Sequence, residues 1–482
     1  MAEELTSPRR SASAGRPRVM VVAVVASLAT FIAFLDATIV NIAFPSIHAG
    51  FPAWSMDSLS WVMNAYNILF AALLMPAGRY ADRFGRKAMF TAGLIVFVVA
   101  SLLCALAPGA GLLIVLRGVQ AVGAAMIVPS SLALLLAAFP ESRRGVAVSL
   151  FAATGGLAAG IGPALGGFLI EVWDWRVVFA VNVPIGLVAA IVAWVWLTEA
   201  KDEAATAWPD IVSIVCSVAG FGLLALGIVK GHDWGWADWH TVGSLCAGIV
   251  LVLIVAQRCR THPAPLIEAT ILTDRTVAAA NASTFVFAVA FYGYLLANVL
   301  FLTSLWHYST VRAGLALTPA PLLSTLVARP AGILYDRFGG RYIAAAGAVL
   351  VALGLTWYVR FVHVQPGFLT DFLPGAALSG LGVGMLFASL SAAAVQGVAG
   401  ARFATATAFS SGLRQLGAVL GIAACVSYLG AHGANRLGSF QVLWEGAAIV
   451  TVVAGAVALA LRPPSRPRES EPSETTESTR IG

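Results

Sequence analysis

The chain has very little charge. Only 11% of its 482 residues are Asp, Glu, Lys or Arg, while 59% are hydrophobic. A soluble domain has about a quarter of its residues charged, so this composition excludes an ordinary water-soluble protein. The apolar runs are separated by brief turns and flanked by two short tails, and no loop is long enough to fold as a soluble catalytic domain. We therefore expect the protein to lie in a bilayer and to function within its helices.

Motifs for metals, nucleotides and disulfides are also missing. The five cysteines show no C-x-x-C pairing, and no Cys/His cluster, H-E-x-x-H motif or G-x-x-x-x-G-K-[ST] loop occurs. We expect no cofactor, no metal and no ATP hydrolysis, and the residues suggest no enzyme. The net charge of +6 reflects Lys and Arg at helix ends, so no nucleic-acid partner is expected.

Long apolar runs fill most of the chain. A helix that spans a bilayer needs about 20 mostly apolar residues. Fourteen such runs are predicted, at 19–44, 59–80, 88–107, 111–138, 144–171, 177–198, 209–229, 240–256, 276–304, 313–334, 342–362, 369–395, 403–430 and 440–461. The expected fold class is an all-α membrane protein with 14 transmembrane helices.

Lys and Arg are distributed unevenly between the connections, and positive residues stay on the cytoplasmic side. One face has most of them: Arg9, Arg10, Arg16, Arg18, Arg83, Arg86, Lys87, Arg143, Arg144, Arg258, Arg260, Arg337 and Arg341. Most Trp residues cluster at the opposite face, as interfacial anchors do. The pattern predicts a multi-pass protein of the cell membrane with both termini cytoplasmic.

A basic turn occurs twice, as GRYADRFGRK at 78–87 and as GILYDRFGGR at 332–341. Internal repeats of this kind are typical of secondary transporters, whose site lies between two halves. The expected segments are a cytoplasmic tail (1–18), a six-helix half (19–200), a central two-helix insertion (201–262), a second six-helix half (263–461) and a disordered cytoplasmic tail (462–482). We expect the turns to form a conformational latch, with a merely topogenic basic loop as the alternative; the latch residues would be Gly78, Asp82, Arg83, Gly85, Arg86, Asp336 and Arg337.

Two charged residues lie deep inside predicted spans of the first half. Asp36 lies about 26 Å from the inner end of the first span, and Arg117 lies about 9 Å below the outer boundary, at 1.5 Å per residue. Burial penalises the charged carboxylate, so Asp36 is a candidate to take up a proton. The similar depths favour a coupled pair. A structural Asp and a snorkelling Arg are the alternatives.

Four motifs together resemble one protein family. LDATIVNIAFP at 35–45, GRYADRFGRK at 78–87, RGVQAVGAA at 117–125 and GIGPALGG at 160–167 are similar to signatures of the major facilitator superfamily, in its fourteen-helix drug:proton antiporter branch of the EmrB/QacA type. Ala121 and Ala158 stand where the family usually has Gly. The resemblance implies two six-helix halves plus two central helices, a monomer, and an antiporter motif formed by Gly162, Pro163, Gly166 and Gly167.

The resemblance also implies proton-coupled export of amphipathic small molecules by alternating access. The residues expected in the substrate cavity carry polar tips: Asn41, Tyr66, Asn67, Gln120, Tyr292, Asn298 and Arg414. The aromatic residues of the ninth span are equally typical of a core stripe. Because no carboxylate is deeply embedded in the second half, we expect neutral or monocationic guests rather than dications. A proton-coupled uptake transporter and a membrane sensor without transport are the alternatives.

Overall fold

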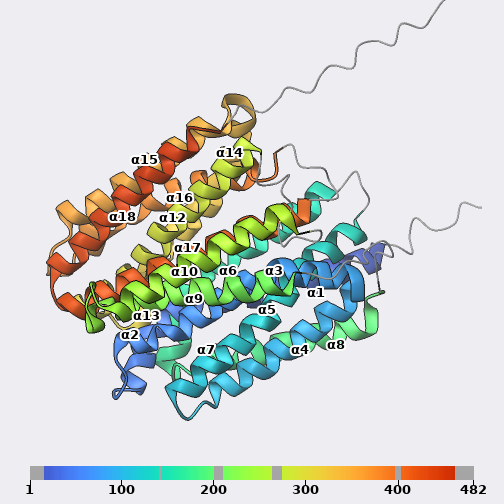
Figure 1. Ribbon diagram of the computed structural model, residues 1–482, viewed down its shortest axis with the longest axis horizontal. Helices are drawn as coiled ribbons and strands as arrows, with labels where there is room; N and C mark the ends of the chain where they lie inside the picture. The colour runs from blue at the N-terminus through green and yellow to red at the C-terminus, as the bar shows by residue number, and fades with distance from the viewer. Residues whose placement is uncertain (1–15, 140–143, 200–209, 263–273, 397–402, 462–482) are drawn as a thin grey trace, which may run out of the picture.

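The computed structural model describes residues 16–139, 144–199, 210–262, 274–396 and 403–461, apart from some side chains within them. In this part of the chain every regular element is a helix, and most run roughly side by side along the long axis (Figure 1). The first part contains α1 (Arg16–Gly50), α2 (Met56–Leu59), α3 (Trp61–Phe84), α4 (Arg86–Ala105), α5 (Ala110–Ala138), α6 (Arg144–Val172), α7 (Val177–Ala180) and α8 (Asn182–Trp196). The rest contains α9 (Ile211–Trp234), α10 (Trp239–Thr261), α12 (Arg275–Leu300), η2 (Phe301–Leu305), α13 (Thr310–Leu317), α14 (Pro319–Phe338), α15 (Gly340–Phe361), η3 (Phe368–Phe372), α16 (Leu373–Ala393), α17 (Phe403–His432) and α18 (Leu437–Ala458).

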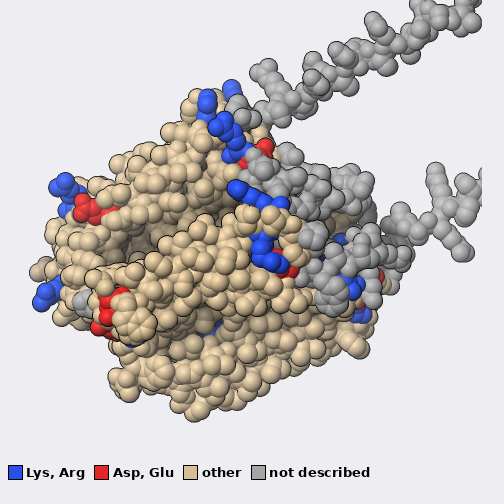
Figure 2. Space-filling model, in the orientation of Figure 1, with Lys and Arg blue, Asp and Glu red and all other residues tan. Residues whose placement is uncertain are grey.

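The surface is that of a membrane protein. Twelve helical segments among the described residues are long and apolar enough to cross a membrane. Figure 2 shows Lys, Arg, Asp and Glu gathered toward the two ends of the molecule in this view, with a broad band between them that is almost free of charge. Large hydrophobic side chains such as Trp194, Leu326 and Leu369 are about 70% exposed, which is stable where lipid replaces water.

Two predicted spans are not among these twelve segments. They correspond to α3 and α6, which have 24 and 29 residues. At 1.5 Å per residue, helices of these lengths extend about 36 and 44 Å. Both contain side chains outside the described set, so the count of fourteen stays a prediction.

The helices form two groups with a pair beside them. Helices α1 to α8 pack among themselves, as do α12 to α18, and the two groups meet mainly where α3 contacts α17 and where α6 contacts α13 and α14. In the pair, α9 packs against α17 and α3, while α10 packs on α9 (Figure 1). Only 17% of the most apolar stretch of α10 is buried, against 72% for α17, so α10 is peripheral and α17 central.

An ion pair joins α9 and α10, the two helices of the pair beside the two groups. Asp210 caps the start of α9 by accepting hydrogen bonds from Ser213, and it accepts two hydrogen bonds of 2.9 Å from the Arg258 guanidinium near the end of α10. Burial alone would raise the pKa of the Asp210 carboxyl, but the hydrogen bonds from Arg258 and Ser213 hold that pKa well below its usual range. The pair therefore fixes the end of α10 to the start of α9.

The two basic turns have the same backbone geometry. Helix α3 ends and α4 begins around Gly85, whose φ is 114° and ψ is 134°. Helix α14 ends and α15 begins around Gly339, whose φ is 88° and ψ is 145°. A positive φ strains any residue with a Cβ, so a single Gly permits each helix–helix turn. We call the end of the bundle that contains these turns the basic end, and the end with the turns at 51–55 and 106–109 the opposite end.

Candidate functional site

The first half contains a fully buried ion pair between α1 and α5. An Arg117 Nη1 donates to Asp36 Oδ2 at 2.6 Å, and neither residue is more than 1% exposed. The Arg117 Nε donates to the carbonyl oxygen of Val62 on α3 at 3.1 Å. The structure therefore brings together the two charged residues that the sequence places at similar depths, and it ties them to a third helix.

Two amides complete the environment of the Asp36 carboxylate. Gln120 Nε2 donates to Asp36 Oδ1 at 2.9 Å, and Asn182 Nδ2 at the start of α8 donates to the same oxygen at 3.2 Å. Gln120 also accepts from Arg117 at 2.6 Å and donates to Ser101 of α4 at 2.7 Å. Charge-assisted hydrogen bonds of this kind stabilise a buried carboxylate. The network links five helices of the first half, and no described residue of the second half belongs to it.

Aromatic rings close this cluster. The Arg117 guanidinium lies 4.1 Å from the ring centroid of Tyr66 and 5.6 Å from that of Phe179. Tyr66 is 1% exposed and its hydroxyl donates to the Ala33 carbonyl at 3.4 Å, while Gln120 is fully buried. Tyr66 and Gln120 were expected in the substrate cavity, but their contacts place them in the Asp36 cluster, because the buried guanidinium needs partners on several sides.

The residues of the antiporter motif on α6 face two different helices. Gly162 lies against Thr38, and Gly166 lies against Ile39 and Ile42, so neither position has room for a Cβ beside α1. The next residue, Gly167, packs on the other half of the molecule. These glycines let α6 approach α1 closely.

The contact between α6 and α13 is reciprocal and involves backbone on both sides. A Cβ at Gly167 would collide with the Thr310 carbonyl, and a Cβ at Gly314 would collide with the Pro163 carbonyl. Only glycines permit this separation. The motif therefore lies between the helix that contains Asp36 and the second half of the protein.

The basic turn between α3 and α4 is held by a residue from the end of the first half. The Glu199 carboxylate, three residues after α8, accepts from the backbone N–H groups of Lys87 at 3.0 Å and Ala88 at 3.1 Å, which caps α4. Lys87 in turn donates its Nζ to the Trp194 carbonyl at 2.8 Å. A carboxylate at a helix N-terminus is favourable for the helix dipole. Sequence reasoning missed Glu199, whose only signal was its place directly after an apolar run.

The other expected latch residues lie at the two turns. A Cβ added at Gly78 would lie 3.6 Å from the Cβ of Pro129, which is an ordinary contact distance. Arg83 and Arg337 each lie over the ring of the following residue, at 5.7 and 5.3 Å from the centroids. Arg86 begins α4. The side chains of Asp82 and Asp336 lie outside the described residues, so their expected contacts stay predictions.

The remaining residues expected in the cavity lie on α1, α3, α12 and α17. Asn41 and Asn67 are 6% and 7% exposed, and Asn41 donates to the Ala37 carbonyl of its own helix. Asn298 is 4% exposed and accepts from Trp444 Nε1 at 2.8 Å, so it belongs to the aromatic core between α12 and α18. Tyr292 is half-buried beside Phe291. For Asn298 the core-stripe alternative describes the structure better, because a buried indole N–H needs an acceptor.

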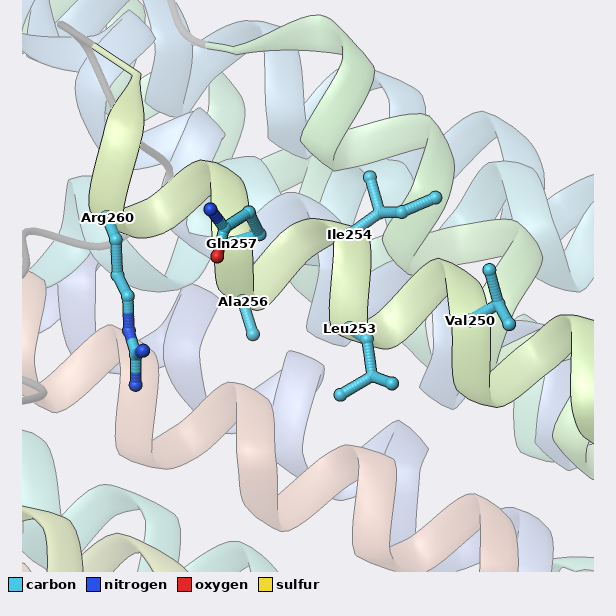
Figure 3. Close-up of a pocket in the computed structure, with 6 residues that line it drawn as sticks. All are labelled: Val250, Leu253, Ile254, Ala256, Gln257 and Arg260. Carbon is cyan, nitrogen blue, oxygen red and sulfur yellow. The ribbon is translucent and has the colours of Figure 1, made fainter.

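The described part of the bundle includes two hollows of very different size. One, of about 470 Å³, lies along the exposed face of α10, where Leu253, Ala256 and Arg260 point to one side and Val250 and Ile254 to the other (Figure 3). Because α10 is the peripheral helix, this hollow faces the lipid. The other, of about 40 Å³, lies between α12, α16 and α17 and includes Arg414.

Comparisons with known proteins agree with this architecture. The family model described as Major Facilitator Superfamily matches residues 26–257 and 280–481. The chain is 31% identical to the multidrug resistance protein Stp of Mycobacterium tuberculosis, over 84% of this chain and 74% of the relative. It is 30% identical to the tetracenomycin C resistance and export protein of Streptomyces glaucescens, over 88% of this chain and 77% of the relative.

A third relative bears on the branch of the family. The chain is 29% identical to the multidrug export protein EmrB of Haemophilus influenzae, over 82% of this chain and 77% of the relative. The resemblance drawn from the four motifs is thus confirmed. Two packed groups of membrane helices, a repeated basic turn and a family match over nearly the whole length lead to one conclusion: the chain is a membrane-embedded transporter that belongs to the major facilitator superfamily, in its drug-export branch.

Proposed function

We propose that this protein exports amphipathic small molecules from the cell in exchange for protons, by alternating access between its two halves. The observation that carries the proposal is the buried Asp36–Arg117 pair, with its oxygen–nitrogen distance of 2.6 Å. An ionisable pair inside a membrane bundle is costly and typically marks a proton pathway. Relatives described as multidrug resistance and export proteins support the direction of transport.

The network around Asp36 supplies a two-state element. In the charged state, the carboxylate receives hydrogen bonds from Arg117, Gln120 and Asn182. When Asp36 takes a proton its charge disappears, and these charge-assisted bonds weaken. Arg117 then needs a different partner, so α1 and α5 shift relative to each other.

A chain of packed residues connects this shift to the second half. Thr38 and Ile39 follow Asp36 within one turn of α1 and contact Gly162 and Gly166 of α6. Helix α6 in turn contacts α13 through Gly167. A movement of α1 therefore displaces the contact between α6 and α13, which we call the seam between the halves. In this way protonation would open one end of the bundle and close the other.

The proposal also includes the orientation of the protein in the membrane and the free energy available per proton. We place the basic end and both termini in the cytoplasm, with residues 19–200 and 263–461 as the moving halves and 201–262 as the central pair, in a monomer. One proton entering through 100 mV and one pH unit provides about 2.3 and about 1.4 kcal/mol. That supports a gradient of roughly 10² to 10³ for a neutral guest.

The test compares Asp36→Asn with Asp174→Asn, which changes an exposed carboxylate near the opposite end, in inverted vesicles that carry an imposed pH gradient. We expect wild type and Asp174→Asn to concentrate a fluorescent amphipathic dye in a gradient-dependent way, and Asp36→Asn to lose this because an amide takes no proton. Gradient-dependent transport by Asp36→Asn at the wild-type rate would disprove the coupling role. Proton-driven dye movement in the reverse direction would identify an uptake transporter, and no movement of any dye would favour a sensor.

A further inference from the structure

A small polar cavity lies inside the second half, away from the Asp36 cluster. Its volume is about 40 Å³, far below the several hundred Å³ of a drug-sized site, so it admits only a group of a few atoms. Its walls come from the early part of α12, the last turns of α16 and the first turns of α17. The lining residues are Thr284, Phe387, Ser391, Ala394, Thr407, Ser410, Ser411 and Arg414.

Arg414 is the charged residue of this lining. The Nε of its guanidinium is buried and has no hydrogen-bond partner, and the group lies 5.7 Å from the ring centroid of Phe387. Among the described carboxylates none lies within 4.0 Å of it. Arg stays protonated in proteins, so this cation faces the cavity with donors unused. Arg117, by contrast, donates hydrogen bonds to a carboxylate, a side-chain amide oxygen and a backbone carbonyl.

Further unsatisfied polar atoms occur on the same helices, within one turn of two lining residues. Asn281, one turn before Thr284, is 3% exposed and both polar atoms of its side chain lack partners. Gln415, next to Arg414, is also 3% exposed and its Oε1 lacks a partner. Buried polar groups are normally paired, so these atoms have unused hydrogen-bonding capacity.

An aromatic surface adjoins the cavity. Phe387 packs against Phe287 and Phe291 of α12, at 4.9 and 5.5 Å between ring centroids. Phe291 contacts Tyr292 of the same helix, at 5.0 Å between ring centroids. A molecule with an ionised group in the cavity would place an aromatic or aliphatic body against the partly exposed rings of Phe387 and Phe291.

We propose that this cavity is the anchoring subsite for an anionic group, such as a carboxylate, a sulfonate or an ionised phenol, on the exported molecule. The inference rests on the proposed export function and names its preferred substrate class. The guanidinium fork of Arg414 matches a planar carboxylate, and the hydroxyls of Ser410 and Ser411 add donors at the same wall. This anionic subsite differs from the expectation of neutral or monocationic guests. That expectation followed from the lack of a deeply embedded carboxylate in the second half and did not consider Arg414.

The position and the energetics agree with an anion. Thr284 lies about 14 Å from the start of α12 by helix rise, on the side of the basic end. If that end is cytoplasmic, the subsite is on the side from which an exported molecule enters. An anion that leaves and a proton that enters both move with an inside-negative potential, so the exchange uses the potential for both charges.

The test measures binding of two matched probes, 1-pyrenebutyrate and its methyl ester, to the full protein in phosphatidylcholine nanodiscs without a proton gradient. Wild type is expected to bind the acid about tenfold more tightly than the ester, the effect of a charge-assisted hydrogen bond. Arg414→Gln should remove this preference by weakening the acid and leaving the ester within about twofold, and Arg414→Lys should keep part of it. Arg360→Gln, at the far end of α15, is the control and should change neither probe.

Equal binding of both probes by wild type would overturn the inference. So would an equal loss of both in Arg414→Gln, because that result indicates a structural role. If Arg414→Gln fails to fold, Ser411→Ala is expected to weaken the acid alone, and an unchanged acid affinity in that variant would contradict the subsite. Because no gradient is present, a failure of proton-driven export would count against the proposed function and leave the binding preference standing.

Discussion

At the scale of single residues, the Asp36 cluster shows how a charge is kept in a membrane bundle. Arg117 supplies the countercharge, Gln120 and Asn182 supply neutral donors, and Tyr66 covers the guanidinium with its ring. Removing one partner of a buried ion pair destabilises the fold more than replacing both partners, because the remaining charge is buried without a countercharge or water. The neutral donors are therefore the positions at which the cluster can be adjusted without being destroyed.

Asn182→Leu tests this adjustment. The substitution removes one hydrogen bond to the charged form of Asp36, so the protonated form becomes relatively more favourable. We expect the pH of half-maximal transport to move upward by a few tenths to about one pH unit, the equivalent of one net hydrogen bond. Gln441→Leu, which removes an amide on α18 that donates to the Val359 carbonyl, is the control. If the pH of half-maximal transport is unchanged or lower in Asn182→Leu, Asn182 does not stabilise the charged form of Asp36.

At the scale of helices, two of the tightly packed glycine contacts bear directly on the proposed mechanism. One is the seam where α6 meets α13, with backbone against backbone at Gly167 and Gly314. The other is the turn at Gly85, where an added Cβ would strike the Glu199 carboxylate and the positive φ would be strained in addition. Both are places where a single methyl group changes the packing of two whole helices.

Gly167→Ala is expected to reduce transport severely, because the methyl group separates α6 from α13 by displacing the Thr310 backbone. Gly160→Ala on the same helix is the matched control, since its new methyl would meet Leu322 at 3.7 Å, an ordinary contact distance. Transport rates in vesicles, normalised to the amount of inserted protein, compare the two. Similar rates for both variants would show that the seam is not tightly packed during transport.

Glu199→Ala tests the cap of α4. Loss of an N-terminal cap typically costs about 1 kcal/mol, and for a chain of 482 residues this should lower the melting temperature by about 1 °C. If the turn is a latch, the variant should also exchange between conformations at a changed rate while equilibrium binding of the dye stays the same. Glu445→Ala, an exposed carboxylate on α18, is the control. Lost dye affinity at an unchanged exchange rate would contradict the latch.

At the scale of the whole molecule, the proposed mechanism depends on two halves that pack separately and meet at few seams. The Asp36 network lies within the first half, and the Arg414 cavity lies within the second. Proton and guest would therefore act on different halves and communicate through the contacts of α6 with α13 and of α3 with α17. Coupling through a shared seam needs no direct contact between the two ligands.

Reporter fusions test the proposed orientation. Fusions after Arg86 and after Arg341 should be cytoplasmic, and fusions near Pro52 and Trp236 should be extracytoplasmic, because the Lys and Arg residues concentrate at the first pair of turns. Enzymatic reporters active on only one side of the membrane provide the measurement. A cytoplasmic reading near Trp236 would mean that α9 and α10 do not both cross the bilayer, and the fourteen-helix count would then be wrong.

The amino-acid sequence by itself determined the membrane environment, most helix boundaries to within about six residues, the repeated turn and the family, because each depends on local composition or on a contiguous motif. It also placed Asp36 and Arg117 at similar depths, since helix rise converts residue number into position along one axis. Rotation about that axis and the choice of neighbour depend on packing between distant segments. Only the tertiary structure therefore decided that Asn182 and Tyr66 join the Asp36 cluster, that Asn298 pairs with Trp444 in a core, that Glu199 caps α4, and that Arg414 is left facing a cavity without a partner.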